Sequence, residues 1–420
     1  MIHQDTIVAL ATPSGAGAIA IIRLSGSKAI TIASEVFNAK SKKKLSLQKS
    51  HTVHLGNIVD GERIIDEVLA SIFKNPHSYT GEDVVEISCH GSAYIQQEIL
   101  QLFLRKGARM ASAGEFTLQA FLNGKMDLSQ AEAVADLIAS DSKASHQLAI
   151  QQMRGGFSSE IKLLREGLLN FASLIELELD FAEEDVEFAN RDDFQKLISK
   201  ITILLKKLID SFATGNVLKN GIPVAIVGRP NSGKSTLLNS LLNEERAIVS
   251  DIAGTTRDTI EDEITLGGVR FRFIDTAGLR ETTDEIEKIG VARALEKLEN
   301  SSIYMYLFDS ADMTLHKIEE DLQNFKTNSK QLIVANKIDK ASKEQLSILQ
   351  NSDLDIVYIS AKDKGSLEEL TNILLEKAEI GALDSNQLIV TNSRHYDILQ
   401  KALEEISSVQ EGINSNLSGD

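Results

Sequence analysis

Gly228-Arg-Pro-Asn-Ser-Gly-Lys-Ser235 is the stretch that decides the fold of this chain. It follows the apolar segment 223–227 and precedes a helical pattern, which is the strand–loop–helix setting of a P-loop. In such a loop, backbone N–H groups converge on phosphate oxygens at a helix N-terminus, and Lys234 adds a positive charge. We expect the Ser235 hydroxyl to bind Mg²⁺. The residues expected to contact the nucleotide here are Asn231, Ser232, Gly233, Lys234, Ser235 and Thr236.

Three further segments follow predicted strands in the order that a nucleotide site requires. Asp275-Thr276-Ala277-Gly278 can hold the metal through a water and sense a γ-phosphate through the Gly278 N–H. Asn336-Lys337-Ile-Asp339 supplies a carboxylate that can accept both the N1–H and the N2–H of guanine, a pair of donors that adenine lacks. Ser360-Ala361-Lys362 completes the base-binding loop. The sequence therefore predicts a GTP site.

The loop Gly254-Thr255-Thr256-Arg257-Asp258 lies between the P-loop and Asp275 and is placed to close over the nucleotide. We expect Thr256 to join Ser235 on Mg²⁺ while a γ-phosphate is present. Leu279 stands where an attacking water is often positioned by a glutamine, so another group must do this. Residues 280–287 offer several candidates for a base. The transition state also needs positive charge, from an arginine or from a monovalent cation bound beside Asn231.

The chain around this site divides into segments with different periodicities. Residues 1–120 predict a mixed α and β domain with strands near 19–24, 51–59 and 83–88 and a helix over 92–105. A capping-box spacing at Ser129–Glu132 predicts a helix start, and helical periodicity then dominates residues 121–216. Residues 217–382 alternate helices with apolar strands expected at 223–227, 269–274, 303–308, 331–335 and 355–359. Gly267-Gly268 predicts an antiparallel edge hairpin. Residues 383–420 return to a helical pattern, so the α/β domain is predicted to be inserted into a helical one.

Composition limits the classes of function. The chain has 420 residues, of which 42% are hydrophobic and 25% charged, typical of a globular protein with two or three domains. One cysteine, Cys89, excludes an internal disulfide framework and favours a buried structural thiol. The net charge of −17 argues against a protein coated by nucleic acid, although residues 1–120 are nearly neutral. Without a signal-peptide pattern or a long apolar run, we expect a cytoplasmic protein with no membrane contact.

Several of these motifs together resemble a known family. The loop G-x-x-N-x-G-K-S, the G-T-T-R-D switch, D-T-A-G-L-R and N-K-x-D are similar to those of the TrmE-Era-EngA-like GTPases. The segments ATPSGAGAIAIIRLSG, PHSYTGEDVVEISCHG, GEFTLQAFLNGKMDLSQAEAVADLI and ELELDFAEED resemble, more narrowly, the MnmE (TrmE) family of tRNA modification GTPases. This resemblance extends over nearly the whole chain.

The resemblance implies a function that composition does not show. The family installs a carboxymethylaminomethyl-type group at C5 of a tRNA wobble uridine, together with the flavoprotein MnmG (GidA), with which it forms a heterotetramer. Its N-terminal domain forms the homodimer and binds 5-formyl-tetrahydrofolate or a related tetrahydrofolate. By position, Arg23, Glu82 and Lys125 would contact the folate, with cations for its carboxylates and a carboxylate for the pterin N–H edge.

The resemblance also implies hydrolysis that is stimulated by K⁺ and accompanied by dimerisation of the G domains. Asn231 and the backbone at Ser250, Ile252 and Thr255 would surround K⁺, and Glu287 would orient the attacking water through a second water. Lys234 would act on the phosphates during catalysis. The switch residues expected beside the nucleotide and cation are Ser250, Asp251, Ile252, Ala253, Gly254, Thr255 and Thr256.

The C-terminus departs from the family pattern. Family members end in Cys-x-Gly-Lys, whereas this sequence ends in Asn-Leu-Ser-Gly-Asp420, so we expect a truncated chain with weakened folate binding. The alternative function is an RNA- or ribosome-binding switch GTPase of the Era or EngA type. Those proteins carry a basic RNA-binding domain, whereas the only roughly neutral unit here is residues 1–120. A third reading is a folate-dependent one-carbon transferase regulated by GTP.

Overall fold

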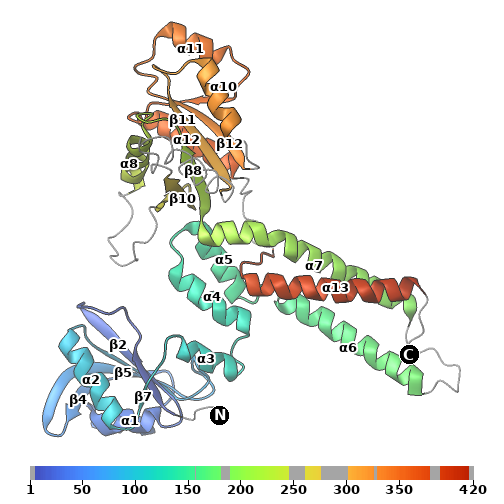
Figure 1. Ribbon diagram of the computed structural model, residues 1–420. Helices are drawn as coiled ribbons and strands as arrows, with labels where there is room; N and C mark the ends of the chain where they lie inside the picture. The colour runs from blue at the N-terminus through green and yellow to red at the C-terminus, as the bar shows by residue number, and fades with distance from the viewer. Residues whose placement is uncertain are drawn as a thin grey trace, which may run out of the picture. The chain divides into compact units, whose positions relative to one another are not determined.

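The computed structural model describes residues 5–156, 158–180, 190–245, 261–275, 301–325, 329–378 and 388–415. The chain divides into two compact units, residues 1–135 and 136–420 (Figure 1). In the part of the chain that the structure describes, no helix is both long enough and apolar enough to cross a membrane.

The first unit is built on a seven-stranded sheet in the order β3-β4-β5-β6-β2-β1-β7. Neighbouring strands are antiparallel except β1 and β7, which run parallel. The strands are β1 Ile7–Leu10, β2 Ile19–Ser25, β3 Phe37–Ala39, β4 Thr52–Asp60, β5 Arg63–Phe73, β6 Val84–His90 and β7 Arg109–Met110. The helices are α1 Ala29–Val36, α2 Ala93–Arg105 and α3 Glu115–Leu122, with a short 3-10 helix, η1, at Leu45–Leu47.

Alternation along the strands places one apolar face in the core of this unit. Ile22 and Leu24 on β2 and Val85 and Ile87 on β6 are fully buried, and they pack with α1 and α2 in one cluster. The expected helix over 92–105 is observed as α2, with Ser92 at its N-cap. The sequence-based expectation included β2, β4 and β6 and missed the others.

One predicted helix start was wrong. The next helix, α4, begins at Leu128 and runs to Ala139, so Ser129 lies inside its first turn. The reciprocal bonds that start it link Asp127 and Gln130: the Gln130 N–H donates to Asp127 Oδ1 over 2.9 Å, and the Asp127 N–H donates to Gln130 Oε1 over 2.9 Å. Because an aspartate caps a helix as well as a serine does, the box is shifted by two residues from the Ser129–Glu132 spacing.

The second unit contains a six-stranded sheet in the order β13-β12-β11-β8-β10-β9. All pairs are parallel except β9 and β10, which form the antiparallel edge hairpin expected at Gly267-Gly268. The strands are β8 Ile222–Val227, β9 Glu261–Leu266, β10 Val269–Asp275, β11 Ile303–Asp309, β12 Lys330–Asn336 and β13 Ile356–Tyr358. The helices connecting them are α8 Lys234–Glu245, α10 Leu315–Asn324, α11 Lys343–Gln350 and α12 Lys364–Lys377.

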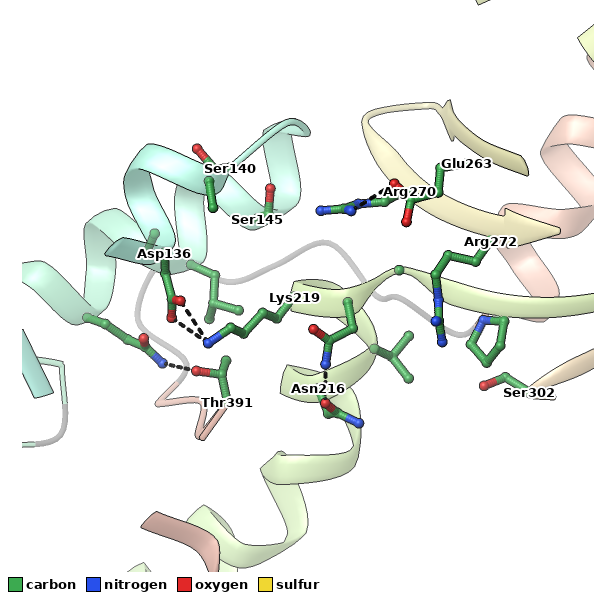
Figure 2. Close-up of a pocket in the computed structure, with 18 residues that line it drawn as sticks. Asp136, Ser140, Ser145, Asn216, Lys219, Glu263, Arg270, Arg272, Ser302 and Thr391 are labelled. Carbon is green, nitrogen blue, oxygen red and sulfur yellow. Dashed lines mark hydrogen bonds and ion pairs between the residues drawn. The ribbon is translucent and has the colours of Figure 1, made fainter. Parts of the chain in front are cut away.

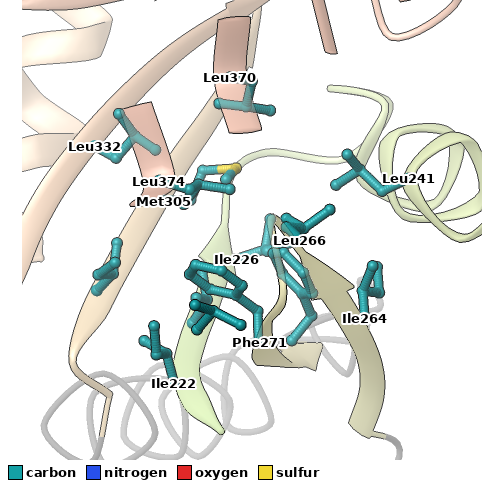
Figure 3. Close-up of a cluster of buried hydrophobic side chains, with 14 of the residues drawn as sticks. Ile222, Ile226, Leu241, Ile264, Leu266, Phe271, Met305, Leu332, Leu370 and Leu374 are labelled. Carbon is teal, nitrogen blue, oxygen red and sulfur yellow. The ribbon is translucent and has the colours of Figure 1, made fainter. Parts of the chain in front are cut away.

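This sheet is buried on both faces, as parallel strands require. Val224 and Ile226 of β8 point to one face, where they pack with Phe271, Met305 and the apolar side chains of α8 and α12 (Figure 3). Ala225 and Val227 point to the other face and pack below α10 and α11. Because β8 is buried on both faces of the sheet, the start of the loop that follows it is held in place.

Long helices complete the second unit. They are α5 Lys143–Met153, α6 Ser158–Asp180, α7 Arg191–Asn220 and α13 Ser393–Asn414. α13 packs against α7 through Leu399, Leu205 and Leu208, although the whole six-stranded sheet lies between these helices in sequence. Figure 1 shows α6, α7 and α13 running alongside one another. The expected fold class is confirmed: an N-terminal α+β part, a helical part and a Ras-like α/β domain.

Candidate functional site

The P-loop leaves the carboxyl end of β8 and enters α8 at Lys234. Gly228 and Gly233 have φ angles of +154° and +98°, and a Cβ at Gly228 would lie 2.0 Å from the Leu307 carbonyl oxygen. Only glycine permits that approach, so the loop can pass close over β11. Lys234 Nζ donates to the Gly228 carbonyl oxygen over 2.5 Å and to that of Arg229 over 3.3 Å. The ammonium group is therefore held over the loop that would carry the phosphates.

Asn336, at the end of β12, ties the P-loop to the predicted base-binding loops. Its side chain is buried, and its Nδ2 donates to the Ser232 carbonyl oxygen over 2.9 Å. Its Oδ1 accepts the N–H groups of Lys337 and Ala361 at 2.8 and 3.0 Å. One amide therefore links three segments that are far apart in sequence, and each of its bonds is made inside protein, where an unmade bond costs about 1–3 kcal/mol.

Lys337 and Asp339 extend this connection. Lys337, at φ +62°, donates from Nζ to the Asn231 carbonyl oxygen at 2.6 Å and to Asp309 Oδ2 at 2.7 Å. Asp339 Oδ1 accepts the Ser360 hydroxyl at 2.9 Å. The carboxylate predicted to recognise guanine is thus held by a hydrogen bond from the loop after β13.

Ser232 adds a polar atom inside the loop. Its side chain is only 2% exposed, and its Oγ has no hydrogen-bond partner among the described residues. Such a buried hydroxyl is costly unless a water, an ion or a ligand satisfies it. This feature and the two converging loops fit a nucleotide better than a purely structural turn.

An ion pair between the exposed Arg229 and the partly buried Asp321 supports the first turn of the loop from the side. Arg229 makes two 2.8 Å bonds to the Asp321 carboxylate on α10, and the Tyr306 hydroxyl donates to the same group at 2.6 Å. Burial alone would raise the pKa of Asp321, but hydrogen bonds from Arg229 and Tyr306 hold that pKa below its ordinary value. Burial raises the pKa of Tyr306, so its hydroxyl stays a donor.

A large polar cavity lies elsewhere in the second unit. It has a volume of about 640 Å³ and is lined by α5, the end of α7 and the first part of the sheet, with the Lys219–Asp136 ion pair of 2.8 Å inside it (Figure 2). Arg270 also reaches this cavity and bonds to Glu263 at 3.1 Å. None of the P-loop residues lines this cavity.

The first unit brings the three residues predicted to contact a folate into one neighbourhood. Arg23 lies on β2, and two residues further along that strand the Ser25 hydroxyl donates to Glu82 Oε2 over 2.9 Å. Gly81 precedes Glu82 in the chain, and a Cβ built on Gly81 would lie 3.2 Å from Lys125 Cγ. The Lys125 side chain therefore passes close to this segment. Lys125 Nζ donates to the Pro76 carbonyl oxygen over 3.0 Å.

Sequence reasoning missed the aromatic part of this cluster. The Arg23 guanidinium lies 5.3 Å from the Tyr79 ring centre and 5.6 Å from that of Phe116, while it pairs with Glu86 at 2.6 Å. The only sequence feature that could have indicated Tyr79 is its position three residues before Glu82. Phe116 comes from a distant segment, and no local pattern points to it.

Other predicted site residues lie outside the described part of the chain. These are Ser250, Asp251, Ile252, Ala253, Gly254, Thr255, Thr256, Thr276, Ala277, Gly278 and Glu287. Asp275 ends β10 and is paired with Ile226 of β8. Thr236 and Lys362 are exposed near the P-loop helix start and the β13 loop respectively.

Cys89 is buried at 3% exposure, and its Sγ lies 3.5 Å from the Ala20 carbonyl oxygen. Burial raises the pKa of its thiol to about 11, which leaves it a poor nucleophile. The expectation of a structural cysteine is confirmed.

A P-loop bonded to a second loop that carries an oriented aspartate, on a Ras-like sheet, defines a guanine-nucleotide-binding protein of the P-loop class. Residues 6–125 match the family described as GTP-binding protein TrmE N-terminus, and residues 128–420 match the MnmE helical domain. The chain belongs to the MnmE (TrmE) family of tRNA modification GTPases.

Two sequence relatives agree with this assignment. The tRNA modification GTPase MnmE of Flavobacterium psychrophilum is 63% identical over all of this chain and 92% of its own length. The protein of the same name from Bacteroides thetaiotaomicron is 54% identical, with the same two coverages. A crystal structure of Era from Aquifex aeolicus is 32% identical over 41% of this chain and 62% of its own, with a TM-score of 0.31.

Proposed function

We propose that this chain hydrolyses GTP in a K⁺-stimulated reaction that drives the addition of a carboxymethylaminomethyl-type group to C5 of tRNA wobble uridines. The observation that carries the nucleotide part is the bonding of Asn336 and Lys337 to the P-loop at Ser232 and Asn231. These bonds fix the base-recognition loop relative to the phosphate loop before any ligand binds, which lowers the ordering cost of binding.

Two cations would be held by this site. Ser235, exposed in the first turn of α8, would bind Mg²⁺ together with Thr256. Asn231 is exposed at φ +64°, and its side-chain oxygen would join backbone oxygens of Ser250, Ile252 and Thr255 around K⁺. A monovalent cation supplies positive charge beside the breaking bond, where other P-loop GTPases use an arginine.

Residues of the chain would perform the remaining work of hydrolysis. Lys234 neutralises charge on the phosphates from its place above the loop. Glu287 would orient the attacking water through a second water, because Leu279 has no polar atom with which to do so. GTP turnover in KCl and in NaCl, measured for the wild type and for Asn231→Ala, tests the cation. Equal wild-type rates in the two salts would remove it from the mechanism.

The test of the water-orienting group is Glu287→Ala, with Glu285→Ala as a matched control two residues away. We expect Glu287→Ala to bind GTP normally and to lose at least about 100-fold in turnover, since positioned acid–base groups contribute about 10²–10⁴-fold. Unchanged turnover would assign the task to another residue.

The N-terminal unit would bind a tetrahydrofolate, such as the 5-formyl derivative, as one-carbon donor. Its residues fit the ligand: Arg23 and Lys125 can bind carboxylates, Glu82 can accept the pterin N–H groups, and two aromatic rings flank the guanidinium. When bound, the folate would supply the carbon unit, and the protein residues would orient it.

The same unit would form the homodimer, which would then assemble with the flavoprotein MnmG into a heterotetramer on tRNA in the cytoplasm. The exposed apolar side chains of Val53, Leu55 and Leu69 on β4 and β5, with exposures of 61%, 48% and 45%, support a contact between copies here. Sedimentation analysis of the wild type and of Leu55→Glu tests this surface.

The alternative is an RNA- or ribosome-binding switch of the Era or EngA type. Nucleoside analysis of tRNA from cells lacking the protein separates the two functions. Loss of the C5 modification supports the proposal, whereas intact tRNA with defective ribosomes supports the alternative.

A further inference from the structure

Four lysines gather on the turn between β3 and β4 of the first unit: Lys42, Lys43, Lys44 and Lys49, here called the lysine loop. We propose that the lysine loop binds the phosphate backbone of tRNA. This rests on the proposed function, which names tRNA as the substrate, and it adds the surface that holds the RNA.

The charge of this segment differs from that of the rest of the protein. Residues 36–59 contain five lysines and no aspartate or glutamate, in a chain whose net charge is −17. Lys40 forms an ion pair with Glu67, but no ion pair joins a lysine of the lysine loop to any residue that the structure describes. All four side chains are exposed. A polyanion approaching an acidic protein therefore meets uncompensated positive charge here.

The lysine loop is held in shape before any partner binds. Leu45, in its middle, is 2% exposed and belongs to the apolar core under α1. The Lys42 N–H donates to the Ala39 carbonyl oxygen at 2.9 Å. The Gln48 side-chain amide donates to the Lys44 carbonyl oxygen at 2.9 Å. At the far end, the Thr52 hydroxyl donates to the Lys49 carbonyl oxygen at 2.6 Å. A preformed basic turn loses little backbone entropy on binding.

A second group of lysines lies on α7 and provides the comparison. Residues 194–209 carry Lys196, Lys200, Lys206 and Lys207 and no acid. Lys196 pairs with Asp193 at 3.0 Å, and these charges are spread over a longer stretch of helix. The α7 lysines also belong to the part of the chain in which acidic residues outnumber basic ones. The electrostatic field around them is therefore less favourable to RNA.

The test compares two triple variants of this chain. One is Lys42→Glu/Lys43→Glu/Lys44→Glu, and its matched control is Lys200→Glu/Lys206→Glu/Lys207→Glu. Binding of unmodified tRNA is measured between about 50 and 200 mM KCl, with and without MnmG, and GTP turnover is measured in the same buffers. Each phosphate contact contributes about 0.7–0.9 to the slope of log affinity against log salt.

We expect the lysine-loop variant to lose at least about 10-fold in tRNA affinity and about 2 in the salt slope, with unchanged GTP turnover. The α7 variant should bind tRNA like the wild type. Equal tRNA binding by the wild type and the lysine-loop variant would overturn this inference and leave the proposed function intact. The same holds if only the α7 variant loses tRNA affinity. A wild type that binds no tRNA in either setting would overturn both.

The exposed Leu47, at 78%, would also suit an anionic lipid surface. Vesicles of phosphatidylcholine with phosphatidylglycerol therefore form the last arm of the experiment. Binding to these vesicles through the lysine loop, without binding to tRNA, would contradict the inference.

Discussion

The nucleotide site and the residues proposed to bind a folate are organised in different ways. In the second unit, the P-loop and the segments at Asn336 and Ser360 lie at the ends of the parallel strands β8, β12 and β13, and Asn336 joins these loops. In the first unit, Arg23, Glu82 and Lys125 come from a strand, a loop and a segment after a helix, with Phe116 added from α3. Local sequence motifs predict the nucleotide site, whereas the cluster around Arg23 depends on antiparallel pairing between distant segments. Each region can be broken without the other.

The largest effect is expected for Gly233→Ala. The new Cβ would lie 2.3 Å from Asn336 Nδ2, at a φ of +98°, so the bond from Asn336 to Ser232 must break. We expect at least about 100-fold weaker GTP binding, or about 2.7 kcal/mol, with folate binding unchanged. Titration with a fluorescent GTP analogue measures this.

Gly365→Ala is the matched control for that variant. Gly365 lies in the first turn of α12 without a positive φ, and its nearest neighbour atom would be 3.5 Å away. GTP affinity should not change, and stability should rise by about 0.5–1 kcal/mol. If both variants bind GTP equally well, the loop connection is not what preorganises the site.

Arg23→Ala breaks the other region. It removes the contacts with Tyr79 and Phe116 and the cation available to a carboxylate. We expect about 10- to 30-fold weaker folate binding by calorimetry, since cation–π and charge-assisted contacts together are worth about 2 kcal/mol. GTP affinity should stay within twofold. Arg23→Lys keeps the charge and should recover part of the loss.

Asp321→Asn sharpens the comparison through pH. The pKa of Asp321 in the folded protein lies below its ordinary value of 3.8, so its stabilising contribution is present above about pH 3.8 and is lost as pH falls through the lower folded value. We expect the variant to be less stable by about 1–2 kcal/mol at pH 7, with the difference shrinking in acid. Urea unfolding at pH 7 and pH 3 measures it. The exposed pair variant Asp193→Asn should show almost no change.

The smallest effect is expected at Cys89. Because the pKa of its thiol is about 11, iodoacetamide should alkylate the folded protein slowly at pH 8, and much faster in urea. Cys89→Ala should keep GTP turnover within twofold and cost about 1 kcal/mol of stability. Rapid native alkylation, followed by mass spectrometry, would show that the thiol is accessible.

Sequence patterns predicted the nucleotide domain well because its signals are local. The apolar strands β8, β10, β11 and β12 and the hairpin at Gly267-Gly268 appeared where periodicity and glycine placed them. The short β1, β3 and β7 were missed, since strands of two to four residues have no measurable period. The 11-residue β5 was missed as well, although its length would have permitted a prediction. The Ser129–Glu132 capping box was wrong because Asp127 and Gln130 offer the same chemistry two residues earlier, and spacing alone cannot choose between them.

The sequence by itself determined the chemistry of the phosphate and base loops, because glycine spacing, a lysine and an aspartate act within a few residues of one another. The tertiary structure alone decided which side chains from distant segments meet: Asn336 beneath the P-loop, Arg23 between two rings, and α13 against α7. These meetings depend on strand order, register and burial of apolar faces, which are properties of the whole folded chain and have no local signal.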